Sequence, residues 1–279
     1  MPPGTLYVVA TPIGNLGDLS PRAAEVLRSV RAVAAEDTRR TLQLFAHLGA
    51  PSPPMIALPA FDERGRAGAV LARLAAGEDV ALCTDAGTPG VSDPGQQLVK
   101  AAWEAGARVV PVPGPCAAVA ALAASGLASD RFFVQGFLPR KGGGRAEALE
   151  LLRRMPATIV LYEAGNRTGE TLRELAAVLG DRPAAVAREL TKLHEEIARG
   201  PLSTLAERFA EGARGEVTLV VAGASAEALP ERPVEPLEDE LRRRIAAGEP
   251  PSGIAREVAK ARGLKRAEVY DALERLKHG

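Results

Sequence analysis

The sequence contains very little cysteine. Cys83 and Cys116 are the two thiols among 279 residues. Two cysteines are too few for a disulfide framework or for the cysteine-rich ligand set of a structural zinc site. We therefore expect two reduced thiols that pack as small apolar side chains, and no metal site.

Histidine is also scarce, and the motifs of the commonest hydrolases are missing. His47, His194 and His278 follow no metal-ligand spacing. The chain has no GxSxG, no HExxH, no Walker loop and no GxGxxG after a strand. This argues against covalent catalysis and metal-dependent hydrolysis. Group transfer from a bound cofactor fits better, since positioning alone supplies much of its rate.

Neither an excess of charge nor a long apolar run occurs. The chain carries 35 basic and 35 acidic residues, so nucleic-acid binding would have to come from local charge. No stretch approaches the roughly 18–20 apolar residues that span a bilayer. The first residues, 1–4, lack the basic and apolar parts of a signal peptide. We expect a cytoplasmic protein without a membrane partner.

Apolar, β-rich runs alternate with amphipathic segments along most of the chain. The expected strands are 5–10, 80–83, 108–112, 158–162, 184–187 and 217–221. The expected helices include 68–76, 95–105, 115–125, 145–154, 167–179 and 202–212. This alternation predicts an α/β fold with mostly parallel sheets.

The chain is long enough for two domains of ordinary size, which we expect at 1–115 and 116–229. A Pro/Glu-rich linker, 230–236, follows them. The remaining 237–279 is expected to be a small helical tail that resembles a helix-turn-helix pair. It has local positive charge that suits RNA phosphates, but a packing element or a dimer contact explains it equally well.

Three loops rich in glycine and proline follow predicted strands. The most informative is 83–95, CTDAGTPGVSDPG, which follows the apolar run 80–83. The other two are 11–18, TPIGNLGD, and 113–118, PGPCAA. Ligands of open α/β sheets bind at the carboxyl ends of the strands, where glycine lets the backbone approach closely. We therefore expect the three loops to share one ligand cleft.

These loops also carry a family resemblance. In chain order, TPIGNLGD, AAEDTRRT, TDAGTPGVSDPG, PVPGPCA, GFLPRK and ARELTKLHEE resemble the ribosomal RNA small subunit methyltransferase I family, a member of the tetrapyrrole-methylase (class III) methyltransferases. The resemblance covers about residues 5–221. It implies two unlike α/β domains, S-adenosylmethionine as cofactor, and 2'-O-methylation of a cytidine in the decoding region of 16S ribosomal RNA. It also implies a homodimer and a 16S rRNA or 30S subunit partner.

The resemblance places the cofactor against the three loops and two residues of the second domain. S-adenosylmethionine needs backbone hydrogen bonds for its amino-acid end and an apolar slot for its adenine. The residues expected at the cofactor are Ile13, Asp85, Gly87, Thr88, Cys116, Ala117, Tyr162 and Leu190.

A ribose hydroxyl is a poor nucleophile, so we expect a proton acceptor or a cation near it. Glu36 follows the apolar run 32–35, and Glu189 and Lys192 follow the run 184–187. We expect Lys192 to stabilise the developing alkoxide and Glu36 or Glu189 to accept the proton. Each could instead be part of an ion pair at the end of a strand.

Basic residues near these elements are candidates for phosphate contacts. The loop 137–145 combines Arg140, Lys141 and Arg145 with three glycines, which suits a phosphate-gripping loop, a lid or a plain hinge. Arg39 and Arg167 complete the expected RNA-binding set. Arg167 ends a segment, 162–167, that matches one of the family.

Two other functions fit parts of the sequence. One is a tetrapyrrole (precorrin-type) C-methyltransferase, which would use the same cofactor on a macrocyclic acid. The other is a non-catalytic ribosome-binding factor that retains an unused cleft. AAEDTRRT, FLPRK and ARELTKLHEE argue against the first, and the intact glycines Gly87 and Gly114 argue against the second.

Overall fold

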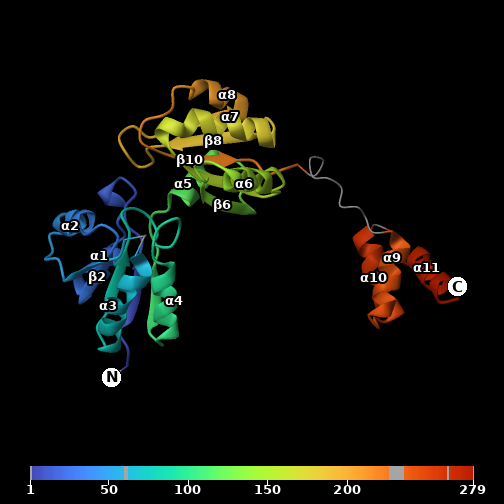
Figure 1. Cartoon of the computed structure of the whole chain (residues 1–279), viewed down its shortest axis with the longest axis horizontal. Helices are drawn as coiled ribbons and strands as arrows, with labels where there is room; N and C mark the ends of the chain where they lie inside the picture. The colour runs from blue at the N-terminus through green and yellow to red at the C-terminus, as the bar shows by residue number, and fades with distance from the viewer. Residues whose placement is uncertain (1, 60–61, 226–235, 263, 279) are drawn as a thin grey trace. The chain divides into compact units, whose positions relative to one another are not determined.

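The computed structural model describes residues 2–59, 62–225, 236–262 and 264–278. Its contacts divide the chain into two compact units, of which the first ends at Ser225. The first unit contains two five-stranded sheets, and the second contains the C-terminal helices (Figure 1). None of the helices in the described ranges is long and apolar enough to span a membrane.

The first sheet is entirely parallel, as predicted. Its strands, in the order β3-β2-β4-β1-β5, are β1 (Thr5–Val9), β2 (Ala32–Ala35), β3 (Met55–Ala57), β4 (Val80–Cys83) and β5 (Arg108–Val112). β2 and β4 are completely buried, which explains their unbroken apolar sequences. Since all strands point the same way, the loops after β1, β2, β4 and β5 gather at one edge.

Helices cover both faces of this sheet. They are α1 (Pro21–Ser29), α2 (Thr38–His47), α3 (Glu63–Ala75) and α4 (Gln96–Glu104), with a 3-10 turn at Leu16–Asp18. The Ser20 hydroxyl caps α1 by accepting from the backbone N–H of Ala23, and proline occupies the first position. One core gathers around Leu6 and Leu82, and the other around Val9 and Phe45.

The second sheet differs from the predicted parallel pairing. Its strands, in the order β6-β7-β10-β8-β9, are β6 (Phe132–Phe137), β7 (Thr158–Ala164), β8 (Pro183–Arg188), β9 (Glu196–Pro201) and β10 (Glu216–Val221). Only β6 and β7 pair in parallel, and the other three pairings are antiparallel. The loop 189–195 between β8 and β9 is too short for a parallel crossover, so these strands form a hairpin.

Helices of the second half also occupy both faces of their sheet. α6 (Gly143–Arg153), α7 (Thr168–Leu179) and α8 (Leu202–Arg208) share a core with Ile159 and Leu161. α5 (Ala117–Ser125) packs on the opposite face, against Val160, Ala185 and Val220. A 3-10 turn, Gly165–Arg167, joins β7 to α7. The last loop of the first sheet therefore leads directly into a helix of the second.

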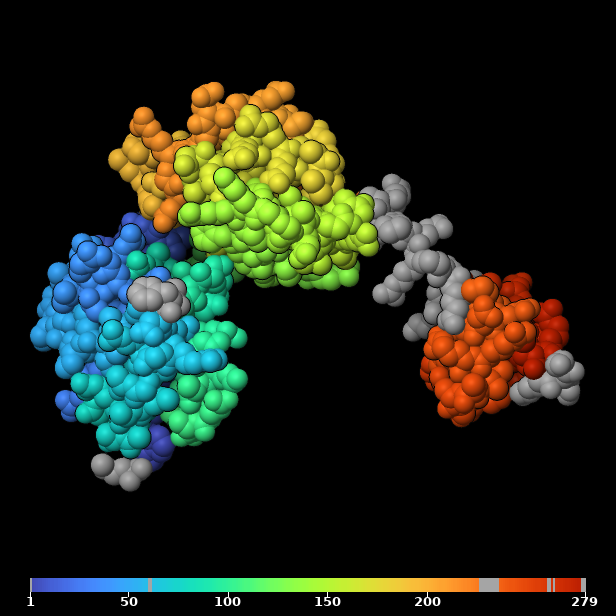
Figure 2. Space-filling model, viewed as in Figure 1, coloured from blue at the N-terminus to red at the C-terminus, as the bar shows by residue number. Residues whose placement is uncertain are grey.

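The tail is helical, as predicted. α9 (Leu237–Ala246), α10 (Pro251–Arg262) and α11 (Arg266–His278) enclose a small core around Leu241, Ile254 and Leu273. In the space-filling view these helices form one compact body (Figure 2). Arg244 adds ion pairs to Glu249 and Glu257, at 2.5 and 2.6 Å. The tail thus has a core of its own.

Candidate active site

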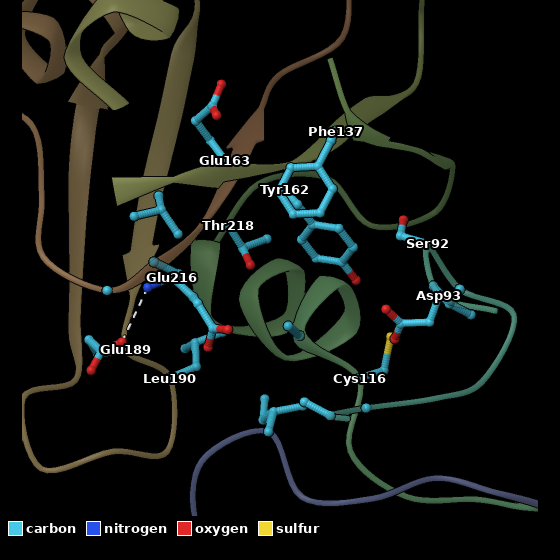
Figure 3. Close-up of a pocket in the computed structure, with 18 of the residues that line it drawn as sticks. Ser92, Asp93, Cys116, Phe137, Tyr162, Glu163, Glu189, Leu190, Glu216 and Thr218 are labelled. Carbon is cyan, nitrogen blue, oxygen red and sulfur yellow. Dashed lines mark hydrogen bonds between the residues drawn. The ribbon is translucent and has the colours of Figure 1, made fainter. Parts of the chain in front are cut away.

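A cavity of about 350 Å³ lies where the loops of the first sheet meet the second sheet (Figure 3). Its walls come from the loops after β1, β4 and β5, from β7 and β10, and from the loop after β8. The lining is mostly apolar, with a few carboxylates and one lysine. Such a lining is typical of a site for an organic cofactor.

The expected cofactor residues converge on this cavity, except one. Ile13, Gly87, Thr88, Cys116, Ala117, Tyr162 and Leu190 all line it. Asp85 does not; it lines a neighbouring cavity instead. The three sequence loops and the second sheet therefore form one site, as the cleft hypothesis requires.

Backbone hydrogen bonds hold the three loops of the first sheet together. Thr11 and Gly87 exchange two N–H···O bonds, of 2.8 and 3.0 Å. The Thr88 hydroxyl donates to the carbonyl of Pro115 at 3.1 Å. A Cβ on Gly114 would lie 3.0 Å from the Cβ of Ala10, so a larger residue would crowd this approach. The cavity wall is thereby preformed.

Strained backbone is concentrated at the cavity. Within the described ranges, the non-glycine residues with positive φ are Ser92 (63°), Glu189 (50°) and Thr191 (67°). Ser92 and Glu189 line the cavity, and Thr191 adjoins Lys192, which also does. Each such conformation costs on the order of 1–3 kcal/mol and is typical of functional sites.

Lys192 is held by two carboxylates. Its Nζ donates to Glu189 Oε1 and to Glu216 Oε2, both at 2.9 Å. Partial burial opposes its charge, but the two hydrogen bonds outweigh burial and raise the pKa of Lys192. The same hydrogen bond lowers the pKa of Glu189. Lys192 is therefore a fixed cation, and Glu189 is a weak base that orients it.

Glu36 lies behind the cavity rather than on its wall. Its Oε2 accepts from the backbone N–H of Asp85 at 3.1 Å, and Asp85 Oδ1 accepts from the N–H of Asp37 at 3.1 Å. Burial raises the pKa of Glu36. Glu36 lines neither cavity, so its contacts assign it to fixing the loop after β4.

The neighbouring cavity, of about 420 Å³, is the more polar one. It is lined by the loop after β1, by α2 and by Asp85. It shares Ile13, Ala86, Lys192 and Glu216 with the first cavity. Arg40 also lines this cavity, and its Nε lies 3.4 Å from Asp85 Oδ2. Lys192 thus faces both compartments.

Asp93 was not among the expected site residues, although it belongs to the loop 83–95. It lines the first cavity, as does Cys116 (Figure 3). Burial, reinforced by the charges of Glu36 and Asp85, raises the pKa of Asp93 to about 7. The available signal was the second aspartate of that loop, just before Pro94 and Gly95.

Two aromatic rings form another part of the wall. Phe137 and Tyr162 have ring centroids 5.7 Å apart and are tilted by 50°. Phe137 is 60% exposed, which is unusual for such a residue. Burial raises the pKa of Tyr162 to about 12, so its hydroxyl stays neutral. Phe137 lines the cavity but was not among the expected site residues.

The predicted RNA-binding residues differ in their surroundings. Arg140 and Lys141 are exposed between β6 and α6. The Arg39 side chain is 86% exposed and pairs with Asp37 at 2.6 Å. Arg167 is 25% exposed, 3.9 Å from Glu163. Each of these four side chains is at least partly exposed, so it can contact a phosphate group.

Arg145 needs a correction, because the structure buries it. It is 7% exposed, and its guanidinium donates to Glu174, to the carbonyl of Pro139 and to the hydroxyl of Thr171. Thr171 in turn donates to the buried Glu163, which lines the cavity. Arg145 joins α6 to α7 and cannot reach RNA.

The part of the chain that the structure describes contains no group of three or more His, Cys, Asp or Glu side chains able to hold a metal ion. Cys83 is buried, and Cys116 is partly buried at the cavity. Burial raises the pKa of the Cys83 thiol to about 12, so it does not ionise near neutral pH.

Comparisons with solved structures agree with the architecture. A diphthine synthase superimposes with a TM-score of 0.62 and 18% identity, covering 81% of this chain and 92% of that one. A uroporphyrin-III C-methyltransferase from Thermus thermophilus superimposes with a TM-score of 0.57 and 23% identity, covering 82% and 100%. These likenesses establish the fold.

Comparisons of the sequence also identify the family of the chain. Residues 5–206 match the family Tetrapyrrole (Corrin/Porphyrin) Methylases. A ribosomal RNA small subunit methyltransferase I from Synechocystis is 48% identical, covering 96% of each chain. The protein of that name from Xylella fastidiosa (strain Temecula1) is 51% identical, covering 80% of this chain and 83% of its own. S-adenosylmethionine is the methyl donor of such an enzyme. The chain therefore belongs to the ribosomal RNA small subunit methyltransferase I family, with a tetrapyrrole-methylase fold.

Proposed function

We propose that this protein transfers the methyl group of S-adenosylmethionine to the ribose 2'-hydroxyl of a cytidine in the decoding region of 16S ribosomal RNA. The relatives' names supply the small-subunit RNA, and the sequence motifs supply the 2'-hydroxyl and the nucleotide. The observation that carries the proposal is the cavity itself. Seven of the eight expected cofactor residues meet there, beside a lysine that also faces a second compartment.

The first cavity suits the methyl donor. Its volume is within the range of about 300–1,000 Å³ of small-molecule sites. Ile13, Tyr162 and Leu190 offer apolar surface for the adenine and the ribose. The N-terminus of α5, which has no side-chain cap, lies at Cys116 and Ala117 and suits the methionine carboxylate. S-adenosylmethionine, when bound, supplies an electrophilic methyl group.

The second, more polar cavity suits the ribose of the acceptor. Lys192 and Glu216 belong to both cavities, so a hydroxyl entering from the second side meets the Lys192 ammonium. A fixed cation stabilises the negative charge that develops on oxygen as its proton leaves. Glu189 and Glu216 keep Lys192 charged and in position.

The exposed cations around the site suit the RNA backbone. Arg40 lines the second cavity and is 60% exposed, and Arg39 is its neighbour. Arg140 and Lys141 follow the exposed Phe137 ring. Phosphate contacts of this kind position RNA, while stacking on an aromatic ring can hold an unpaired base.

The proposed setting is the cytoplasm, where small ribosomal subunits are available, and the proposed active form is a homodimer. The homodimer follows from the family resemblance. Light scattering of the purified protein tests the second part, with a mass of about twice 29.1 kDa as the expected result. A monomer that is fully active would contradict it.

The experiment for the activity uses the intact protein with methyl-labelled S-adenosylmethionine and 30S subunits that lack decoding-region methylation. Donor binding is measured in parallel by calorimetry. We expect binding and transfer of one methyl group per subunit. Binding without transfer to 30S subunits or to free 16S RNA would overturn the proposed acceptor and leave the donor site standing.

A further inference from the structure

We propose that Glu216 is the proton acceptor of the reaction and takes the proton of the attacking hydroxyl as the methyl group moves. The inference rests on the proposed function and adds a catalytic residue to it. Four described residues line both cavities, namely Ile13, Ala86, Lys192 and Glu216. Glu216 is the one carboxylate among these four, so it lies where a bound donor and an entering ribose meet.

The main chain of Glu216 is fixed by the loop after β8. Its N–H donates to Glu189 Oε1 at 3.2 Å, and its carbonyl accepts from the Glu189 N–H at 3.0 Å. Gly215 before it has a φ of 80°, and a Cβ there would overlap the same Glu189 oxygen. The Glu216 side chain thus extends from a preorganised start of β10.

The two carboxylates that bind Lys192 differ in exposure and in the oxygen atoms that remain free. The Glu189 side chain is 20% exposed, and its Oε1 accepts from both Lys192 Nζ and the Glu216 N–H. The Glu216 side chain is 76% exposed, and its Oε2 accepts from Lys192 Nζ at 2.9 Å. Glu216 Oε1 has no hydrogen-bond partner within the described residues. One oxygen of Glu216 is therefore available to the acceptor hydroxyl.

Lys192 holds the acceptor oxygen next to Glu216. An ammonium has three N–H donors, of which Glu189 and Glu216 take two. The stem of Lys192 is packed against the loop after β1, because a Cβ on Gly14 would lie 2.5 Å from Lys192 Cγ. The ammonium is thus confined at the boundary of the two cavities, with one donor left for the ribose oxygen. An oxygen bound there is a neighbour of the Glu216 carboxylate, since both bind the same nitrogen.

The proposed step is balanced in atoms and electrons. The acceptor oxygen attacks the methyl carbon, so an O–C bond forms and the C–S bond of the sulfonium breaks. The bonding pair goes to sulfur, which leaves as a neutral thioether. The hydroxyl proton passes to Glu216 Oε1, while the Lys192 ammonium stabilises the charge on the acceptor oxygen. Glu216 then releases the proton to water, to which its side chain is open.

The other carboxylates near the site are less suited to this role. Glu189 lines the first cavity alone, so it is separated from the compartment of the ribose. Glu36 lines neither cavity and accepts from the Asp85 N–H. Asp85 lines the second cavity but lies beside Arg40 and accepts from a backbone N–H. The expectation that Glu36 or Glu189 accepts the proton therefore gives way to Glu216.

The test compares Glu216→Gln, Glu189→Gln and Glu104→Gln, each of which replaces the carboxylate of a Glu–Lys pair by an amide. Glu104 pairs with Lys100 on the exposed face of α4 and is the outside control. Single-turnover methyl transfer to 30S subunits should fall about 10²–10⁴-fold in Glu216→Gln. It should fall about tenfold in Glu189→Gln, as expected for one lost charged hydrogen bond. Glu104→Gln should match the unaltered protein.

A second measurement, made without substrates, separates proton transfer from support of Lys192. The pKa of Lys192 is obtained from the pH dependence of its labelling by acetic anhydride, followed by mass spectrometry. Hydrogen bonds from both carboxylates raise the pKa of Lys192, so Glu216→Gln and Glu189→Gln should both lower it. Similar shifts in Lys192 with unequal losses of rate would assign the proton to Glu216.

Glu216→Ala provides a further test that does not depend on the amide. Since the side chain is 76% exposed, small carboxylates can reach its place. Formate and acetate should partly restore transfer in Glu216→Ala, relative to chloride at the same ionic strength. Acetate should act more strongly because it is the stronger base. No response to either anion would contradict the proposed role.

Three other results would overturn the inference. The first is a Glu216→Gln variant that keeps its rate. The second is an equal loss of rate in Glu216→Gln and Glu189→Gln, which would make Glu216 a positioning residue for Lys192. The third is loss of donor binding in Glu216→Gln with an unchanged melting temperature, which would make Glu216 a donor contact. Failure of the unaltered protein to methylate 30S subunits would instead count against the proposed function.

Discussion

At the scale of single residues, the site contains two ionisable groups with contrasting surroundings. Lys192 has two carboxylate partners at 2.9 Å, whereas the charged groups with the largest effect on Asp93 are the carboxylates Glu36, Asp85 and Glu216. The first arrangement fixes a positive charge, and the second favours a carboxyl group that exchanges its proton near neutral pH.

Replacing Lys192 by Met keeps the aliphatic stem and removes the ammonium. We expect a fall in maximal transfer rate of about 10²–10³-fold, as is typical when one stabilising donor is lost. Donor affinity should change little. Single-turnover kinetics and calorimetry separate the two effects, and Lys100→Met on the exposed face of α4 is the matched control. An unchanged rate would remove Lys192 from the mechanism.

Asp93 also predicts a pH dependence of stability. Its pKa is higher in the folded protein, about 7, than the ordinary 3.8, so the folded state binds the proton more tightly. This favours folding at pH below 3.8 and becomes a penalty as the pH rises toward 7. Asp93→Asn should therefore raise the melting temperature at pH 8 relative to the unaltered protein, with a difference that vanishes near pH 4. The opposite trend would show that a cation faces Asp93.

At the scale of loops and strands, the sequence predicted the loops that line the cavity better than it predicted the strands and their pairing. The loops after β1, β4 and β5 were identifiable because glycine and proline follow apolar runs, and they meet at one cavity. The strands β2, β3, β6 and β9 were not among the expected strands, because they are short or alternate poorly. Antiparallel pairing in the second sheet depends on loop lengths that were unknown without the strand ends.

The loops support a prediction for Gly87→Val. Gly87 has a φ of 82°, and its backbone exchanges both hydrogen bonds with Thr11. A β-branched residue is strained there, and its side chain would add bulk near Ile13 Cγ2, which a Cβ approaches at 3.5 Å. We expect a donor Kd at least about tenfold weaker by calorimetry. Gly143→Val, in open space on α6, is the control.

Arg145 shows that the position of a residue in a helix decides whether its side chain is exposed or buried. A basic residue beside three glycines suggested a surface loop, but its position at the first turn of α6 turns it inward, toward α7. Arg145→Ala leaves Glu174 and Thr171 without this partner and should reduce the free energy of unfolding by about 2–3 kcal/mol. Urea denaturation measures this. A variant with normal stability and weak RNA binding would restore the original prediction.

At the scale of the molecule, a net charge of zero leaves RNA binding to local groups. Arg140→Ala with Lys141→Ala removes two exposed cations after Phe137 and should weaken RNA binding at low salt. Because two phosphate contacts would be lost, the dependence of log K on log salt should flatten by up to about 2. Donor affinity should be unchanged. Equal salt slopes with and without the two cations would make the loop a hinge.

The most direct test of the account is to identify the methylated atom. The protein is incubated with S-adenosylmethionine carrying a deuterated methyl group and with 30S subunits that lack decoding-region methylation, and the RNA is digested and analysed by mass spectrometry. The account predicts one deuterated methyl group, on the ribose 2'-oxygen of a single cytidine in the decoding region. A label on a base, or on no RNA atom while the donor is bound, would contradict it.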